Sequence, residues 1–164
     1  VLMVLPLLVF SQKKTANVNP YFTENHQLTL ETAYTLTELA RTTAKSMGKQ
    51  VSIAVLDQSG LIVLMSRGDG VGPHNTEAAR RKAYTALTTK TGTLALARTA
   101  KANPDSENLA HLPELLLLGG GVPLWYNNKI VGSIGVAGGG GAENDDLIAK
   151  SAQLPQAHIT TNKD

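Results

Sequence analysis

The sequence contains no cysteine among its 164 residues. A disulfide framework and a site built on a thiolate are therefore both excluded. Aromatic residues make up only 4% of the chain, so we expect no platform on which nucleic-acid bases could stack. The formal net charge of +2 is also too small to indicate binding to nucleic acid or to an anionic membrane surface.

Recognisable catalytic and metal-binding patterns are also missing. The four histidines lie far apart in the sequence and show no metal-ligand spacing: His26, His74, His111 and His158. Ser133 lies within an apolar run without the sharp turn that a nucleophilic serine needs. Asp57 and Asp69 lie in predicted turns, where aspartate commonly accepts backbone hydrogen bonds. The residues alone therefore identify no catalytic group.

The chain begins with an apolar stretch, Val1 to Phe10, that is too short to span a bilayer comfortably. The stretch fits the apolar region of a secretory signal peptide whose basic first part is missing. The alternative is an N-terminal strand or helix that packs on the domain. Residues 11–27 are polar and predict a tether. We expect an exported protein, periplasmic or extracellular, with no integral membrane span in the mature chain.

Hydrophobic spacing predicts a helix and a hairpin at the start of the domain. Thr29 can cap a helix that runs to Met47, since apolar residues recur there every three or four positions. Gly48 then provides a C-terminal stop. Two strands follow, Val51 to Leu56 and Leu61 to Ser66, joined by a four-residue turn.

Three apolar runs near the end of the chain predict three more antiparallel strands: Leu115 to Leu118, Val122 to Tyr126 and Lys129 to Ala137. Asn127-Asn128 suits a tight hairpin turn, because asparagine tolerates positive φ. Further helices are predicted over residues 75–90, 94–101 and from Ala142 onward. The predicted fold is therefore α+β, a five-stranded and mainly antiparallel sheet with flanking helices. We expect the domain to cover residues 28–155 and a polar tail to cover 156–164.

Two glycine runs, residues 119–121 and 138–141, resemble loops that cradle phosphate, and the second precedes a helix. However, no Gly-Lys-Ser/Thr ending follows, and the nearby carboxylates of Glu143, Asp145 and Asp146 would repel a phosphate. Structural corners are the better interpretation of both runs.

The helix predicted over residues 75–90 carries Lys82, Thr85 and Thr89 on one polar face, and His74 stands at its entrance. One interpretation is a solvated face whose threonine hydroxyls bond back to the preceding turn. The alternative is a ligand site, with Arg81 or Lys82 near an anionic group and Thr85 or His74 near the ligand centre. The pattern alone favours the solvated face.

A family resemblance supports the ligand site. The segments SIAVLDQSGLIVLMSRGDG, KAYTAL and GGGVPLWYNNKIVGSIGVAGGGGAENDDLIAKSA resemble the GlcG/HbpS family of haem-binding proteins. This family includes the C-terminal domain of PduO-type corrinoid adenosyltransferases, and the resemblance covers residues 28–154. It implies a profilin-like or PAS-like outline and assembly into homo-oligomers.

The resemblance also implies a non-covalently bound b-type haem, with Thr85 as the position near the iron. A porphyrin on that helix surface would set its propionates toward Arg81 and Lys82, and its iron near the hydroxyl of Thr85 or the imidazole of His74. The first functional hypothesis is haem capture, storage or sensing without catalytic machinery. The second is an enzyme or enzyme accessory that acts on a small carboxylate of the glycolate type or on a corrinoid. The third is an oligomeric scaffold.

Self-association is also predicted from the residues. The hairpin of residues 51–66 is apolar on both faces. Four small residues on the last strand leave space that another element must fill closely: Gly132, Ser133, Gly135 and Ala137. We therefore expect a homo-oligomer.

Overall fold

The computed structural model describes residues 21, 23 and 25–163. Within them the helices and strands follow one another in this order: α1 (Leu30–Ser46), β1 (Ser52–Asp57), β2 (Ile62–Arg67), α2 (His74–Thr89), α3 (Thr93–Ala102), α4 (Pro104–Glu107), β3 (Gly121–Tyr126), β4 (Lys129–Ala137), α5 (Ala142–Lys150) and β5 (Ile159–Thr160). Short 3-10 turns lie at Asn108–His111 and Pro155–Ala157. The apolar stretch Val1 to Phe10, for which export was predicted, lies outside the described residues.

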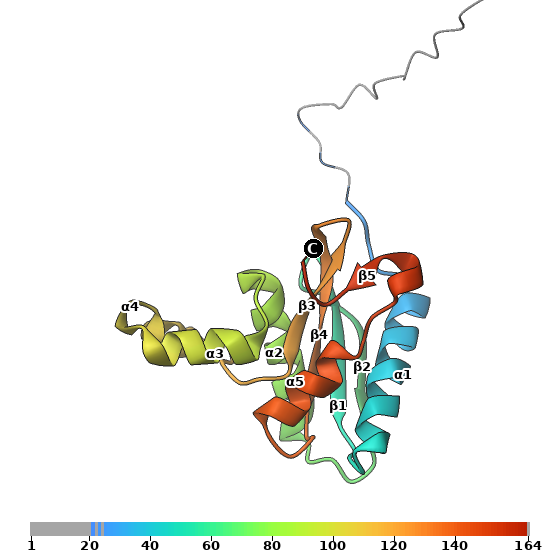
Figure 1. The fold of residues 1–164 in the computed structure, drawn as a ribbon, viewed down its shortest axis with the longest axis horizontal. Helices are drawn as coiled ribbons and strands as arrows, with labels where there is room; N and C mark the ends of the chain where they lie inside the picture. Colours follow the sequence, from blue (N-terminus) through green and yellow to red (C-terminus); the bar gives the residue numbers. More distant parts are fainter. Residues whose placement is uncertain (1–20, 22, 24, 164) are drawn as a thin grey trace, which may run out of the picture.

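The strands form a single five-stranded sheet in the order β2-β1-β4-β3-β5, and all neighbouring strands are antiparallel (Figure 1). The sheet contains two hairpins, β1-β2 and β3-β4. They meet where the whole length of β1 pairs with β4. The predicted α+β fold with a five-stranded antiparallel sheet is confirmed.

One predicted strand is wrong. Leu115 to Leu118 is an irregular connector beside α2, and the fifth strand is β5, which lies in the segment predicted as a polar tail. The amide of Leu116 bonds to a side chain of α2 instead of joining a strand ladder. A four-residue apolar run does not by its periodicity distinguish a strand from a buried connector.

The first helix and the last hairpin form as their local sequences predict. The side-chain oxygen of Thr29 accepts a hydrogen bond from the Thr32 amide at 3.1 Å, which caps α1. Asn127 and Asn128 form the β3-β4 turn with φ of 48° and 60°. Helices α1 and α5 then cover one face of the sheet, where most of the buried apolar side chains gather.

Helix α2 covers the other face and lies unusually close to the sheet (Figure 1). A Cβ atom added to Gly135 of β4 would overlap the Ala79 carbonyl, and one added to Gly121 of β3 would overlap the Lys82 carbonyl. The small residues of β4 therefore make room for a helix of the same chain. The prediction that they mark a contact with another subunit loses that support.

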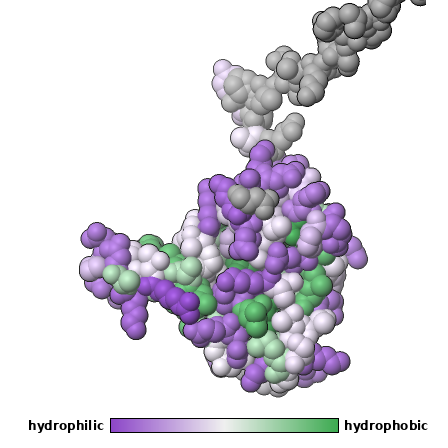
Figure 2. All heavy atoms as spheres, viewed as in Figure 1, coloured by the Kyte–Doolittle hydropathy of each residue, from purple (hydrophilic) through white to green (hydrophobic). Residues whose placement is uncertain are grey.

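Helices α3 and α4 project from the body of the domain as an arm (Figure 1). The connector that follows, residues 109–118, returns from this arm to the sheet and passes alongside α2. On the face drawn in Figure 2, apolar surface occurs in small patches separated by polar ones, and one patch lies over α5, where Leu147 is exposed.

Candidate functional site beside helix α2

Lys82 lies at the centre of a buried ion pair. Its Nζ is 2.7 Å from the Oδ2 of Asp145 and 3.0 Å from the Val136 carbonyl oxygen, and only 1% of its side chain is exposed. The prediction that Lys82 lies near an anionic group of a ligand is therefore wrong, because its ammonium is taken up by Asp145 and the Val136 carbonyl. Lysine is almost never fully buried without a partner, and the aspartate meets that requirement.

Both glycine runs close around this ion pair. The amide of Gly139 donates to the Oδ1 of Asp145 at 2.7 Å. A Cβ atom on Gly120 would lie 2.6 Å from the Cβ of Asp145 and 3.2 Å from the Nζ of Lys82. The runs are thus structural corners, as predicted, and their glycines let the backbone approach two charged side chains that are shielded from water.

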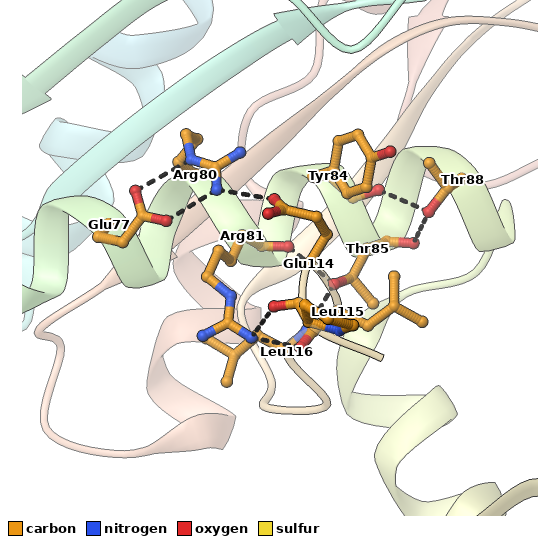
Figure 3. Close-up of polar contacts among 10 residues, drawn as sticks. Glu77, Arg80, Arg81, Tyr84, Thr85, Thr88, Glu114, Leu115 and Leu116 are labelled. Carbon is orange, nitrogen blue, oxygen red and sulfur yellow. Dashed lines mark hydrogen bonds and ion pairs between the residues drawn. The ribbon is translucent and has the colours of Figure 1, made fainter. Parts of the chain in front are cut away.

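Thr85 ties the connector to α2. Its hydroxyl donates to the Arg81 carbonyl at 2.7 Å and accepts from the Leu116 amide at 2.8 Å (Figure 3). The residue is fully buried. The hydroxyl would have to give up the Leu116 bond, or share its second lone pair, in order to approach an iron atom.

Arg81 also holds the connector in place. Its Nη2 donates to the carbonyl oxygens of Pro113 at 2.8 Å and Leu115 at 2.7 Å (Figure 3). Its Nε is buried without a hydrogen-bond partner among the described residues. One nitrogen of the guanidinium thus fixes the chain that runs beside α2.

Arg80 lies between two carboxylates, those of Glu77 and Glu114 (Figure 3). Its Nη2 is 2.7 Å from Glu77 and 3.0 Å from Glu114. The hydrogen bonds that Arg80 donates to Glu77 lower the pKa of the Glu77 carboxyl. The same bonds raise the pKa of Arg80. This exposed network joins the start of α2 to the connector.

His74 does not join Thr85 in one site. It is the first residue of α2 and precedes Thr85 by eleven residues. At 1.5 Å per residue the two lie about 16 Å apart along the helix axis. They therefore cannot serve the same iron atom. Among the described residues, no three histidine or acidic side chains gather as a metal site would require.

An open hollow lies between the second half of α2 and the connector, and we call it the α2 hollow. Its volume is about 500 Å³, and its walls are mostly apolar. Its lining residues are Tyr84, Thr88, Thr89, Leu109, Leu112, Pro113, Glu114 and Leu115. Helix α2 itself offers mostly alanine, and the leucines of the connector supply the apolar wall.

The sequence reasoning missed Tyr84 and the connector. The stretch from residue 103 to 112 has no helical or strand period, and its leucines are separated by polar residues. A local signal was nevertheless present, because leucines flanking Pro113 are costly in a loop unless something covers them.

The molecule is thus a small α+β domain with an open, mostly apolar hollow beside α2. The family model described as "Haem degrading protein HbpS-like" matches residues 28–153. The chain belongs to this family.

Comparison with known proteins agrees with this assignment. The chain is 30% identical over 129 residues to an uncharacterized 15.0 kDa protein of Citrobacter freundii, with 76% of this chain and 89% of that protein covered. It is 28% identical to the corrinoid adenosyltransferase PduO of the same organism, over 76% of this chain. The match spans only 38% of that PduO.

Two solved structures are similar in both fold and sequence. A double mutant of HbpS from Streptomyces reticuli has a TM-score of 0.75 and 32% identity, with 87% of this chain and 95% of that chain covered. A complex of PduOC with haem has a TM-score of 0.73 and 25% identity, with 84% of this chain and 100% of that chain covered. The fold of the family is therefore shared along almost the whole domain.

Proposed function

We propose that this chain binds haem non-covalently in the α2 hollow. The observation that carries the proposal is the apolar wall of the connector beside α2, with Arg80 and Arg81 at its border. The similarity to HbpS and to the haem complex of PduOC supports it.

The residues present fit a porphyrin in three respects. Leu109, Leu112 and Leu115 offer apolar surface, and burial of apolar area would supply most of the affinity. Propionates at an exposed rim would gain about 1 kcal/mol or less each from Arg80 or Arg81, since both guanidiniums already have partners. Tyr84 lines the hollow, and a tyrosine oxygen is one of the ligands that proteins give to haem iron. When bound, the haem would supply the iron chemistry.

The location of the site is tested by a charge placed on its wall. Leu112 is 51% exposed in the α2 hollow, and Leu147 is 56% exposed on α5. Titration of hemin, followed by the Soret band, should saturate at a fixed stoichiometry. Leu112→Glu should weaken binding about tenfold or more, because a carboxylate would face the porphyrin.

Leu147→Glu is the matched control and should bind hemin like the parent, since the substitution and the exposure are similar but the position is remote. Equal affinities for the two variants would place the haem elsewhere. A titration without saturation would refute haem binding itself.

Ligation of the iron by Thr85 or His74 stays a prediction, and Tyr84 is a third candidate. Thr85→Ala should alter the spectrum of bound haem more than its affinity if the hydroxyl ligates. Thr85→Ser keeps the hydroxyl and should retain the parent spectrum. His74→Ala and Tyr84→Phe test the other two oxygen or nitrogen donors in the same way, because loss of an axial ligand changes the Soret maximum. Parent spectra from all four variants would exclude these three residues.

We also propose that the chain forms homo-oligomers through β2. This strand is at the edge of the sheet and exposes Leu61, Ile62 and Met65 around it. Apolar edge strands pair readily with another chain. Light scattering at micromolar concentration should return a multiple of 17.3 kDa, and Ile62→Lys should reduce that mass. A monomer mass for the parent would overturn the proposal.

Export to the periplasm or the medium likewise stays a proposal, supported by the apolar stretch Val1 to Phe10. None of the helices formed by the described residues combines the length and apolar character that a membrane span requires. Fractionation of cells that express the full gene would locate the protein.

A further inference from the structure

A second hollow lies at the end of the sheet where the β3-β4 hairpin turns. Five separate segments border it: the chain before α1, the β1-β2 turn, the end of α2, the β3-β4 hairpin and the chain after β5. Its volume is about 320 Å³. We call it the lysine pocket, after the three lysines in its lining, Lys90, Lys129 and Lys163.

Among the residues that the structure describes, the charged lining of the lysine pocket is of one sign, and no carboxylate belongs to it. Of the eight lysines that the structure describes, Lys82 and Lys150 form ion pairs with aspartates, and three of the other six border this pocket. Like charges that share a hollow repel one another, and a bound anion would remove that repulsion.

The backbone at Lys90 adds an independent observation. Lys90 ends α2 with φ of 54°, and its amide donates to the carbonyls of Ala86 and Leu87. Glycine or asparagine normally occupies such a left-handed helix end, because other side chains are disfavoured there. A lysine thus lines the pocket against the backbone preference of that position, and such strained positions often occur at binding sites.

The lining of the lysine pocket includes apolar side chains, and one of them attracts a cation. Trp125 is only 8% exposed, and the Nζ of Lys163 lies 5.8 Å from the centre of its ring. A cation over an indole face is attracted by the ring. Ile130 and Val131 complete the apolar side of the lining. The three exposed ammonium groups therefore border a hollow that also has apolar side chains in its lining.

We propose that the lysine pocket binds a small dianion, carried either by a phosphate group or by a dicarboxylate. Each ammonium group offers three hydrogen-bond donors and no acceptor, which suits several oxygens of a compact anion. Two negative charges would offset most of the three positive ones. The site is separate from the α2 hollow, and it does not depend on haem binding.

Trp125 is the only tryptophan of the chain, so its fluorescence reports on this pocket. The haem-free full chain is titrated with inorganic phosphate, succinate and acetate at constant ionic strength and at about pH 8, where phosphate is mostly doubly charged. Phosphate or succinate should change the emission saturably, with half-saturation on the order of 1 mM or lower. Acetate, with one charge, should not saturate in the same range.

The two dianions distinguish the sources of the charge. Saturation by phosphate alone assigns a phosphate ligand, and saturation by succinate alone assigns a dicarboxylate. Either result supports the proposal. A response without saturation to both, or the same saturation with acetate, would overturn it.

Lysine variants locate the response. Lys129→Gln and Lys163→Gln should each weaken binding about two- to fivefold, as expected for exposed charge contacts. Lys101→Gln removes the same charge from α3, outside the lysine pocket, and should leave binding unchanged. An equal loss in all three variants would indicate a general charge effect and contradict the site.

Lys90→Gly separates binding from folding. It should weaken dianion binding about two- to fivefold and at the same time raise the melting temperature, because glycine relieves the positive φ. Weaker binding by a more stable protein cannot be attributed to misfolding. Unchanged binding in Lys90→Gly would remove Lys90 from the site. A triple variant that combines Lys90→Gly, Lys129→Gln and Lys163→Gln should not bind the dianion, and unchanged binding in it would overturn the proposal.

Discussion

Asp145→Ala is expected to destabilise the fold by about 3–5 kcal/mol, because it leaves the ammonium of Lys82 buried without its counter-charge. The lysine cannot turn to solvent, since its stem lies between α2 and the sheet and it is 1% exposed. The Gly139 amide would lose its acceptor as well. The loss is measured by urea unfolding, as the shift of the midpoint between proteins that have the same m value.

The control for this prediction lies on the same helix turn. Glu143 pairs with Arg98, and both side chains are mostly exposed. Glu143→Ala removes the same charge from the first turn of α5, so the helix dipole contributes equally to both variants. It should cost less than about 1 kcal/mol. Equal losses for Asp145→Ala and Glu143→Ala would mean that the Lys82–Asp145 pair is not buried.

The double variant Lys82→Met with Asp145→Leu should recover part of the loss. Apolar residues of similar volume can replace a buried ion pair at little cost. Recovery should be incomplete, because the Val136 carbonyl and the Gly139 amide would remain unpaired. If the double variant loses less stability than the sum of the losses in the two single variants, Lys82 and Asp145 stabilise the fold as a pair.

The elements that the sequence predicted well are those whose cause lies within a few residues. Thr29 bonds to an amide three positions later, and Asn127-Asn128 needs only its own positive φ to turn the chain. Helix α2 was also predicted, since its alanine stripe has a helical period. Such local preferences act whatever the rest of the chain does.

The candidate site depended on longer distances, and there the prediction was only partly right. Helical spacing placed Lys82 beside Thr85, but the partner that buries Lys82 lies 63 positions away. The connector is held by Arg81 and Thr85 over 31 to 34 positions, and no local pattern encodes those bonds. The lysine pocket draws on five segments and has no signature in any of them.

Gly135→Val is expected to lower the free energy of unfolding by about 3 kcal/mol or more. Even the first carbon of the new side chain would overlap the Ala79 carbonyl and lie 2.7 Å from the Ala83 nitrogen. These are backbone atoms of α2, so no side-chain rotation can relieve the overlap. The helix cannot move away without loss, because Lys82 ties it to the end of β4 and Arg81 ties it to the connector.

Gly92→Ala provides the comparison. Gly92 precedes α3 with φ of −58°, and a Cβ atom there would lie 3.8 Å from its nearest neighbour, the Gly121 carbonyl. That distance is ordinary contact, so the change should cost about 1 kcal/mol or less, mainly because alanine is a poorer N-cap than glycine. If Gly135→Val unfolded at the same urea concentration as Gly92→Ala, helix α2 could not lie this close to β4. Since α2 forms one wall of the α2 hollow, a folded Gly135→Val protein should also bind hemin more weakly than Gly92→Ala.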